Sequence, residues 1–143
     1  MNEYLKIIKK HSDDISAFPM FFAFNNEQFE KGMKKLGLEK TDTSKICSFN
    51  GGGYLRKTDS KRLMDMFTAH RKEMSDAIAA DKTGEEFIRI MFEYELSNHE
   101  YSYTMDDEPT INALGLTYEK IEKSESLKNG LQLAKNNVMM VDY

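Results

Sequence analysis

The sequence predicts a predominantly α-helical α+β fold in a single domain, 1–143. Apolar residues recur at spacings of three and four along most of the chain, which is the period of amphipathic helices. Only one region, built around consecutive glycines, shows short β-type runs. The chain has 143 residues, of which 40% are hydrophobic and 31% charged, and this is enough to bury a core without disulfides or metals. The last residues, 137–143, are expected to be flexible.

The first third of the chain is predicted to contain two helices joined by an extended segment. Residues 2–17 carry apolar side chains on one helical face. Pro19 disfavours helix at the residue before it, so we expect 18–24 to be extended and buried, with the character of a short strand. A second helix is expected to begin at Asn25, a good N-cap, and to end at Gly37 in a Schellman motif.

Residues 45–57 carry the clearest β signal. Two short runs rich in β-branched and aromatic residues flank Gly51, Gly52 and Gly53, a pattern typical of a β-hairpin with a glycine turn. Because two strands alone are marginally stable, we expect the hairpin to pack on helices or to pair with 18–24.

The second half is predicted to be helical. A long helix is expected at about 60–80, and a T-x-x-E capping box formed by Thr83 and Glu86 is expected to open the next helix, at 84–99. That helix is apolar over a wide arc, which indicates a central position in the core. An exit loop or edge strand should follow and be stopped by Pro109. Further helices are expected at 109–115, 117–122 and 124–137.

The charges divide unevenly along the chain. Residues 1–72 contain 14 Lys/Arg against 9 Asp/Glu, whereas residues 73–143 contain 6 against 15. Such asymmetry arises from contact surfaces of opposite sign, or simply from solvated faces of packed halves. The single cysteine, Cys47, excludes an internal disulfide and favours a reducing cytosol. No run reaches the ~20 apolar residues of a membrane helix, and the N-terminus lacks the apolar segment of an export signal.

Several phrases of the sequence together resemble a known group of proteins. They are FPMFFAF at 18–24, GMKKLGL at 32–38, GGG-x-x-RK at 51–57, YEL-x-NHEY at 94–101 and ALGLTYE at 113–119. The combination resembles a family of small uncharacterised proteins from Firmicutes and their phages or mobile elements. The resemblance implies a compact protein in the cytoplasm of a bacterial host, and it carries no known activity. Phage proteins without enzymatic motifs commonly bind a host protein, and inhibitors of CRISPR or other defence nucleases are one such class.

Two stretches are candidate binding surfaces. One is the glycine hairpin with the aromatic and basic residues after it, and the other is the acidic, tyrosine-containing exit from helix 84–99. The acidic exit would imitate a phosphate track and occupy a basic groove on a partner. The candidate binding residues are Gly51, Gly52, Gly53, Tyr54, Arg56, Lys57, Glu100, Tyr101, Tyr103, Asp106, Asp107 and Glu108.

Two rival functions come from other classes. Helix-borne His and Glu at spacings of three and four build metal sites in bundles, which makes His70, Glu73, Glu95 and His99 an alternative metal-dependent centre. A local basic patch of Arg56, Lys57, Lys61 and Arg62 is an alternative nucleic-acid contact, against a net charge of −4.

The residues give less support to two further hypotheses, a cysteine nucleophile and a phosphate-binding loop. Cys47 lies in a short apolar run with no nucleophile motif, which favours a small core residue. The three glycines are not followed directly by a helix, as a phosphate-binding loop requires. We therefore expect a non-enzymatic protein-binding module without cofactor, and specifically a phage-encoded inhibitor of a host defence nuclease. Nucleic acid is a less favoured partner, and no membrane association is expected.

Overall fold

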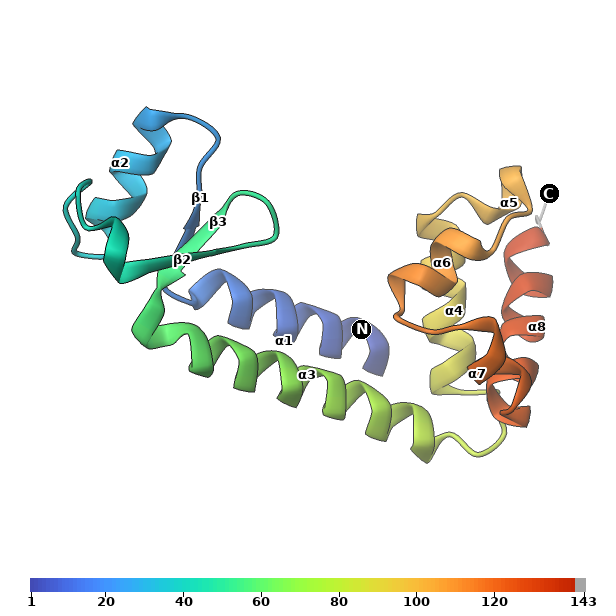
Figure 1. Cartoon of the computed structure of the whole chain (residues 1–143). Helices are drawn as coiled ribbons and strands as arrows, with labels where there is room; N and C mark the ends of the chain where they lie inside the picture. The colour runs from blue at the N-terminus through green and yellow to red at the C-terminus, as the bar shows by residue number, and fades with distance from the viewer. Residues whose placement is uncertain (141–143) are drawn as a thin grey trace. The chain divides into compact units, whose positions relative to one another are not determined.

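The computed structural model describes residues 1–140 and confirms a predominantly helical α+β fold (Figure 1). The elements are, in chain order, α1 (Glu3–Ala17), β1 (Met20–Phe22), α2 (Asn26–Lys35), η1 (Thr43–Lys45), β2 (Ile46–Phe49), β3 (Gly53–Arg56), η2 (Lys57–Asp59), α3 (Ser60–Ala80), α4 (Phe87–Asn98), α5 (Tyr101–Thr104), α6 (Glu108–Ala113), α7 (Tyr118–Glu122) and α8 (Glu125–Met139). Within this described part, no helix combines the length and apolar character needed to cross a bilayer.

The chain divides into two compact units. Lys10–Lys72 form the first, which we call the sheet unit, and Met1–Lys9 together with the residues from Glu73 onward form the second, the helical unit. The single-domain assignment from the sequence stays a prediction. Of the tail predicted to be flexible, 137–139 belong to α8, and 141–143 lie outside the described residues.

The sheet unit contains a three-stranded antiparallel sheet in the order β1-β3-β2. The predicted hairpin is β2–β3, and the predicted short strand is β1, which pairs with β3. Leu55 of β3 lies opposite both Met20 and Cys47, and it is almost fully buried. The central strand is therefore the one that begins directly after the glycine turn.

Helix α2 covers one face of this sheet. The ring of Phe21 lies against Gly32, where an added Cβ would come within 2.1 Å of ring carbons, so only glycine allows this close packing. The same ring stacks on Tyr54 at a centroid distance of 5.3 Å. Met33 and Leu36 complete the cluster, and the helix ends in the predicted Schellman motif.

The other face of the sheet packs on residues of α1 and α3 and of the segment between α1 and β1, all in the same unit. Phe18 and Leu63 join Leu55 in a buried cluster, against which Ile15 packs. Cys47 packs on this cluster as a partly buried side chain, in agreement with its interpretation as a small core residue.

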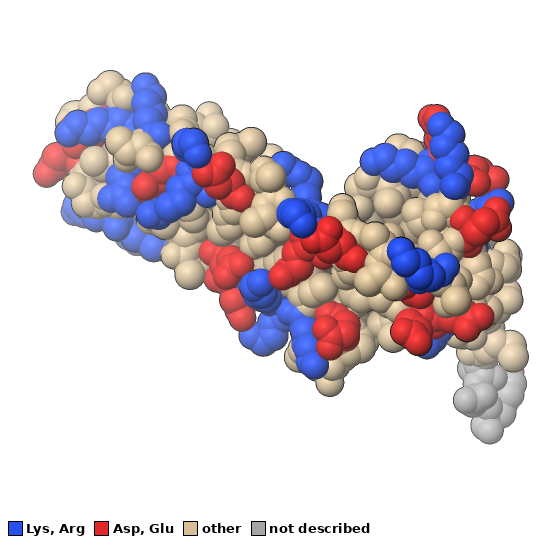
Figure 2. All heavy atoms as spheres, turned by 90° about the horizontal axis from the view of Figure 1, so that it is seen from below, with Lys and Arg blue, Asp and Glu red and all other residues tan. Residues whose placement is uncertain are grey.

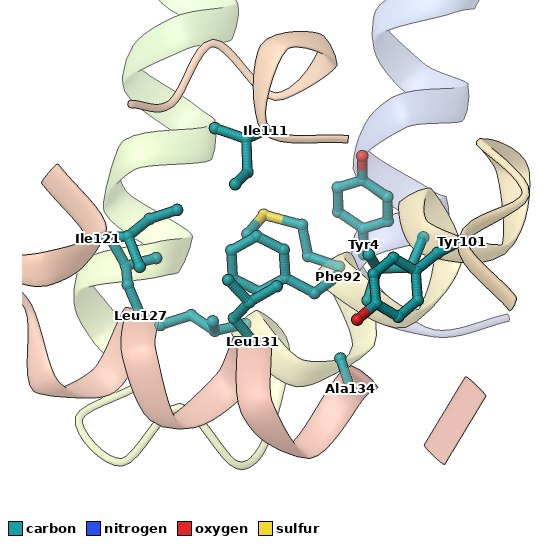
Figure 3. Packing of buried hydrophobic residues seen from close by; sticks show 11 residues of the cluster. Tyr4, Phe92, Tyr101, Ile111, Ile121, Leu127, Leu131 and Ala134 are labelled. Carbon is teal, nitrogen blue, oxygen red and sulfur yellow. The ribbon is translucent and has the colours of Figure 1, made fainter. Parts of the chain in front are cut away.

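The helical unit is built on α4 and α8. Met91, Phe92 and Leu96 of α4 are fully buried and belong to the same cluster as Leu131 and Ala134 of α8. Figure 3 shows Phe92 at the centre of this cluster, surrounded by side chains from several helices. This confirms the central position predicted for helix 84–99 from its wide apolar arc.

The two helices approach closely because glycines meet where α8 contacts the start of α4. A Cβ on Gly84 would lie 2.0 Å from the backbone oxygen of Ser126, and a Cβ on Gly130 would lie 2.4 Å from Ile88. Gly84 also has a φ of 83°, which other residues rarely adopt. Both positions therefore require glycine for packing, and Gly84 requires it for backbone conformation as well.

The turn between α3 and α4 is organised by Asp81 and not by the predicted capping box. The buried Asp81 carboxylate accepts hydrogen bonds from the backbone N–H groups of Gly84 (3.0 Å), Glu86 (3.1 Å) and Ile88 (3.0 Å). Thr83 accepts instead from the N–H of Glu85, so the T-x-x-E box was a wrong prediction. A carboxylate three residues before Gly84 satisfies the free N–H groups at the helix start more completely than a hydroxyl can.

The exit from α4 also differs from the prediction of a loop or edge strand. The chain forms the short helix α5, while Pro109 lies in the first turn of α6, next to the start of the helix predicted at 109–115. Proline is favoured in a first helical turn because the N–H that it lacks has no partner there.

Replacing Asp81 tests its role in the turn. Burial alone would raise its pKa, but the N–H donors of Ile88, Gly84 and Glu86 outweigh that effect and hold the pKa below its ordinary value. We expect Asp81→Asn to lower the free energy of unfolding by about 1–3 kcal/mol at pH 7, since one amide oxygen replaces two acceptors. Urea denaturation measures this loss.

The pH dependence gives a second readout for the same variant. Because the pKa of Asp81 is lower in the folded state, its carboxylate stabilises the fold at pH values above the ordinary pKa of Asp. This contribution to the free energy of unfolding is lost as the pH falls through the folded-state pKa. The difference in free energy of unfolding between wild type and Asp81→Asn should therefore become smaller below about pH 4. Glu85→Gln removes a charge from an exposed side chain of the same turn and serves as control. Equal stability of the two variants at pH 7 would contradict the assignment.

Candidate functional site

The segment 100–108, which we call the exit segment, links α4 to α6. Two of its residues adopt the left-handed conformation, Glu100 with a φ of 60° and Met105 with a φ of 54°. Non-glycine residues rarely do so. One lies directly before α5 and the other directly after it, so the backbone turns sharply at both ends of this short helix.

Asp107 anchors the exit segment to the helices behind it. Its carboxylate accepts hydrogen bonds from Lys135 Nζ of α8 at 2.7 Å and from the hydroxyl of Tyr118 of α7 at 2.6 Å. Lys135 also lies over the Tyr101 ring, 5.6 Å from its centroid. Asp107, which we predicted as a binding residue, therefore uses its oxygens within the chain and fixes the segment in place.

The contacts of Asp107 with Lys135 and Tyr118, which we call the Asp107 anchor, shift the pKa values of Asp107 and Tyr118 in opposite directions. Burial opposes the charge on Asp107, but the hydrogen bonds from Lys135 and Tyr118 outweigh it and hold the pKa below its ordinary value. The hydrogen bond to this carboxylate raises the pKa of Tyr118 to about 12, because it favours the protonated phenol.

Local hydrogen bonds hold the last turn of the exit segment. Thr104 Oγ1 accepts from the N–H of Asp106 at 3.1 Å, and Asp106 Oδ1 accepts from the N–H of Glu108 at 3.0 Å. These are side-chain to backbone turns of the kind that Thr and Asp favour. Together with the Asp107 anchor, they define one conformation for 104–108.

The exit segment presents two large apolar side chains to solvent. Tyr103 is 88% exposed and Met105 is 66% exposed. Glu100, Asp106 and Glu108 are exposed beside them in the sequence, and none has an ion-pair partner within residues 1–140. We call these five residues the exit surface. Tyr101, which was predicted to belong to this surface, is only 7% exposed and lies in the core (Figure 3).

The glycine hairpin is held by aromatic rings. Phe24 packs on Gly52, where an added Cβ would lie 2.7 Å from its ring. Gly53 lies opposite both Phe22 and Phe49, and the rings of these two residues contact each other with their centroids 5.7 Å apart. Of the predicted binding residues here, Gly53 is therefore buried and Gly52 serves as a platform for a ring, while Tyr54 packs beneath α2.

The predicted basic patch is largely neutralised by neighbouring carboxylates. Arg56 Nε lies 2.8 Å from Asp59 Oδ2, and Arg62 lies 3.9 Å from the other oxygen of the same carboxylate. Lys61 pairs with Asp65 at 2.8 Å. Lys57 alone of the four has no carboxylate partner within the described residues. Figure 2 shows basic side chains gathered over the sheet unit, with acidic side chains interspersed.

The residues of the alternative metal centre have other partners. Glu95 is buried, accepts a 2.9 Å hydrogen bond from Tyr4, and lies 3.5 Å from His99 Nε2. Burial, and then the hydrogen bond to Glu95, raise the pKa of Tyr4. The Glu95 carboxylate therefore already has two partners within the helical unit, Tyr4 and His99.

The remaining histidine of that centre belongs to the sheet unit. His70 Nε2 lies 2.9 Å from Asp14 Oδ2, and its ring stacks on His11 with centroids 3.9 Å apart. Glu73 is a half-buried residue of α3. Among residues 1–140, no three His, Cys, Asp or Glu side chains are arranged to hold a metal ion.

Comparison with known proteins places the chain in a family. It belongs to a family of unknown function, DUF7659, whose model matches residues 3–137. The resemblance to an uncharacterised family is thus confirmed, and the origin in Firmicutes and their phages stays a prediction. Neither a protein of curated description nor a solved structure matches the chain significantly.

Titration of Tyr118 tests the anchor of the exit segment. In the wild type its phenol should ionise near pH 12, and in Asp107→Asn the pKa should fall towards the ordinary value of 10. Because the folded pKa is the higher one, the stabilising contribution is present below pH 10 and is lost as the pH rises through about 12. The chemical shift of the Tyr118 Cζ carbon reports its ionisation directly.

Tyr118→Phe assigns the resonance, and Tyr103→Phe, which changes a tyrosine outside the anchor, should leave the titration unchanged. A Tyr118 pKa near 10 in the wild type would show that the hydrogen bond to Asp107 does not form in solution.

Proposed function

We propose that this chain is a non-enzymatic protein-binding module that presents the exit surface to a basic surface of its partner. The observation that carries the proposal is the fixed display of Tyr103 and Met105 next to three carboxylates that have no ion-pair partner among residues 1–140. Exposed aromatic and Met side chains supply binding energy at interfaces, and the carboxylates select partners of opposite charge.

Rigidity supports the proposal. The Asp107 anchor and the hydrogen bonds of Thr104 and Asp106 order the exit segment before any partner arrives. A surface that is ordered in advance loses less conformational entropy on binding. Glu100 and Met105, at the two ends of α5, adopt a strained backbone conformation, and such strain is concentrated at functional positions.

The charge distribution supports a basic partner. The residues of the helical unit include 16 Asp/Glu against 8 Lys/Arg, whereas those of the sheet unit include 8 against 12. An acidic field around the exit surface would accelerate association with a basic groove and would weaken with salt. Grooves of this sign bind nucleic acid, so an acidic, aromatic surface occupies them as a mimic of the phosphate backbone.

The partner that fits this chemistry best is a nuclease or another nucleic-acid-binding complex of a bacterial host. In that case the chain acts in the cytoplasm as a phage-encoded inhibitor of host defence. Direct nucleic-acid binding is less well supported, because Arg56, Lys61 and Arg62 are already paired with carboxylates.

Affinity capture from host lysates with matched variants tests the proposal. The wild-type chain should enrich a specific partner, identified by mass spectrometry. Tyr103→Ala should weaken the interaction by about 30-fold, as expected for a central aromatic anchor. Glu100→Gln, Asp106→Asn and Glu108→Gln combined should slow association, and added salt should have a smaller effect on this variant than on the wild type.

The matched control removes three charges from α7 and α8, as Glu119→Gln, Glu122→Gln and Glu125→Gln. It should retain the partner. The proposal fails if no host protein is enriched, or if the exit-surface variants retain the partner as well as the control does.

A further inference from the structure

The helical unit contains a small surface cavity away from the exit segment. Its volume is about 240 Å³, below the ~300–1,000 Å³ of typical small-molecule sites. The apolar part of its lining comes from Ile7 of α1, Ala77 and Ala80 of α3, and Phe87 of α4. The two alanines leave the cavity open, since larger side chains at these positions would fill it.

Three carboxylates line the same cavity. Asp81 is buried, and its oxygens are occupied by the backbone N–H groups of the turn. Glu86 makes no side-chain hydrogen bond or ion pair with any of residues 1–140. Glu3 has only an exposed contact with Lys6 at 3.4 Å, and such pairs contribute little. Two carboxylates of the rim are therefore available to a cation.

We propose that this cavity takes the side chain of a lysine or arginine from the binding partner. The methylene groups of that side chain would lie on Ile7, Ala77, Ala80 and Phe87, while its charged end would reach Glu3 and Glu86. The ring of Phe87 is held at the cavity by its edge contact with Tyr4, at a centroid distance of 5.9 Å.

The cavity favours a cation over a neutral ligand for an electrostatic reason. The hydrogen bonds of the turn hold the Asp81 carboxylate at the cavity. Its negative charge therefore adds to those of Glu3 and Glu86. A neutral apolar side chain would desolvate these carboxylates without compensation, whereas an ammonium or guanidinium group compensates them. The inference deepens the proposed function by adding a second contact with a basic partner, and it rests on that function only for the origin of the ligand.

Titration of the full chain with blocked amino acids, followed by NMR, tests the cavity directly. Nα-acetyl-lysinamide and Nα-acetyl-argininamide should cause saturable shifts of the Ile7, Ala77 and Ala80 methyl signals, with Kd values on the order of millimolar, as befits one side chain. Nα-acetyl-norleucinamide, which lacks the charge, should bind at least several-fold more weakly.

Three variants sharpen the test. Glu86→Gln should weaken lysinamide binding by about three-fold, and Glu3→Gln with Glu86→Gln by about ten-fold. Ala80→Leu should abolish it by filling the cavity, and Glu119→Gln should leave it unchanged.

The absence of saturable shifts at these methyls, equal binding of norleucinamide, or unchanged binding to the double glutamate variant would overturn the proposal. Because none of these measurements involves the exit surface or a host partner, failure here is distinct from failure of the proposed function.

Discussion

The helical unit depends on one buried carboxylate, that of Asp81. By collecting three backbone N–H groups it fixes the turn from α3 into α4. That turn places Gly84 against α8, where no side chain would fit. The close approach of α4 and α8 then buries Met91, Phe92 and Leu96, which form the centre of the core. A charge buried without donors would cost several kcal/mol, so the turn and the carboxylate stabilise each other.

A second carboxylate, that of Asp107, has the same physical role at the other end of α4. It holds the exit segment through Lys135 and Tyr118, and so connects a surface segment to the helices α7 and α8. The outcome differs because the residues around it remain exposed. Asp81 is enclosed by backbone, whereas Tyr103 and Met105, which precede Asp107 in the exit segment, are exposed to solvent. Ordering a segment without burying it is what a binding surface requires, since the entropy of ordering is lost before the partner arrives.

Local sequence signals predicted the elements whose cause is local. The Schellman ending predicted at Gly37 forms with the expected hydrogen bonds, and the same motif ends α6 at Gly115, because a glycine and the apolar residue after it suffice to specify it. The hairpin at 45–57 and the wide apolar arc of α4 were predictable for the same reason. The role of Asp81 was not, because a T-x-x-E pattern next to it is the usual capping signal and only the fold shows which group is buried. Lys135 lies 28 residues from Asp107, and no periodicity connects the two.

The candidate surfaces show the same limit, since sequence reports charge but not its partners. Arg56, Lys61 and Arg62 looked like a cationic patch, yet Asp59 and Asp65 lie within one helical turn of them and neutralise most of it. In the sequence, residues 106–108 form a short acidic run without distinction among its members. In the structure, the backbone directs the Asp107 carboxylate inward to Lys135, whereas Asp106 and Glu108 on either side are exposed. What separates a contact surface from a solvated face is therefore whether a charge already has a partner. Carboxylates without an ion-pair partner among residues 1–140 include Glu100, Asp106 and Glu108 near Tyr103 and Glu86 at the rim of the cavity near Phe87, which is why we propose a basic partner for both contacts.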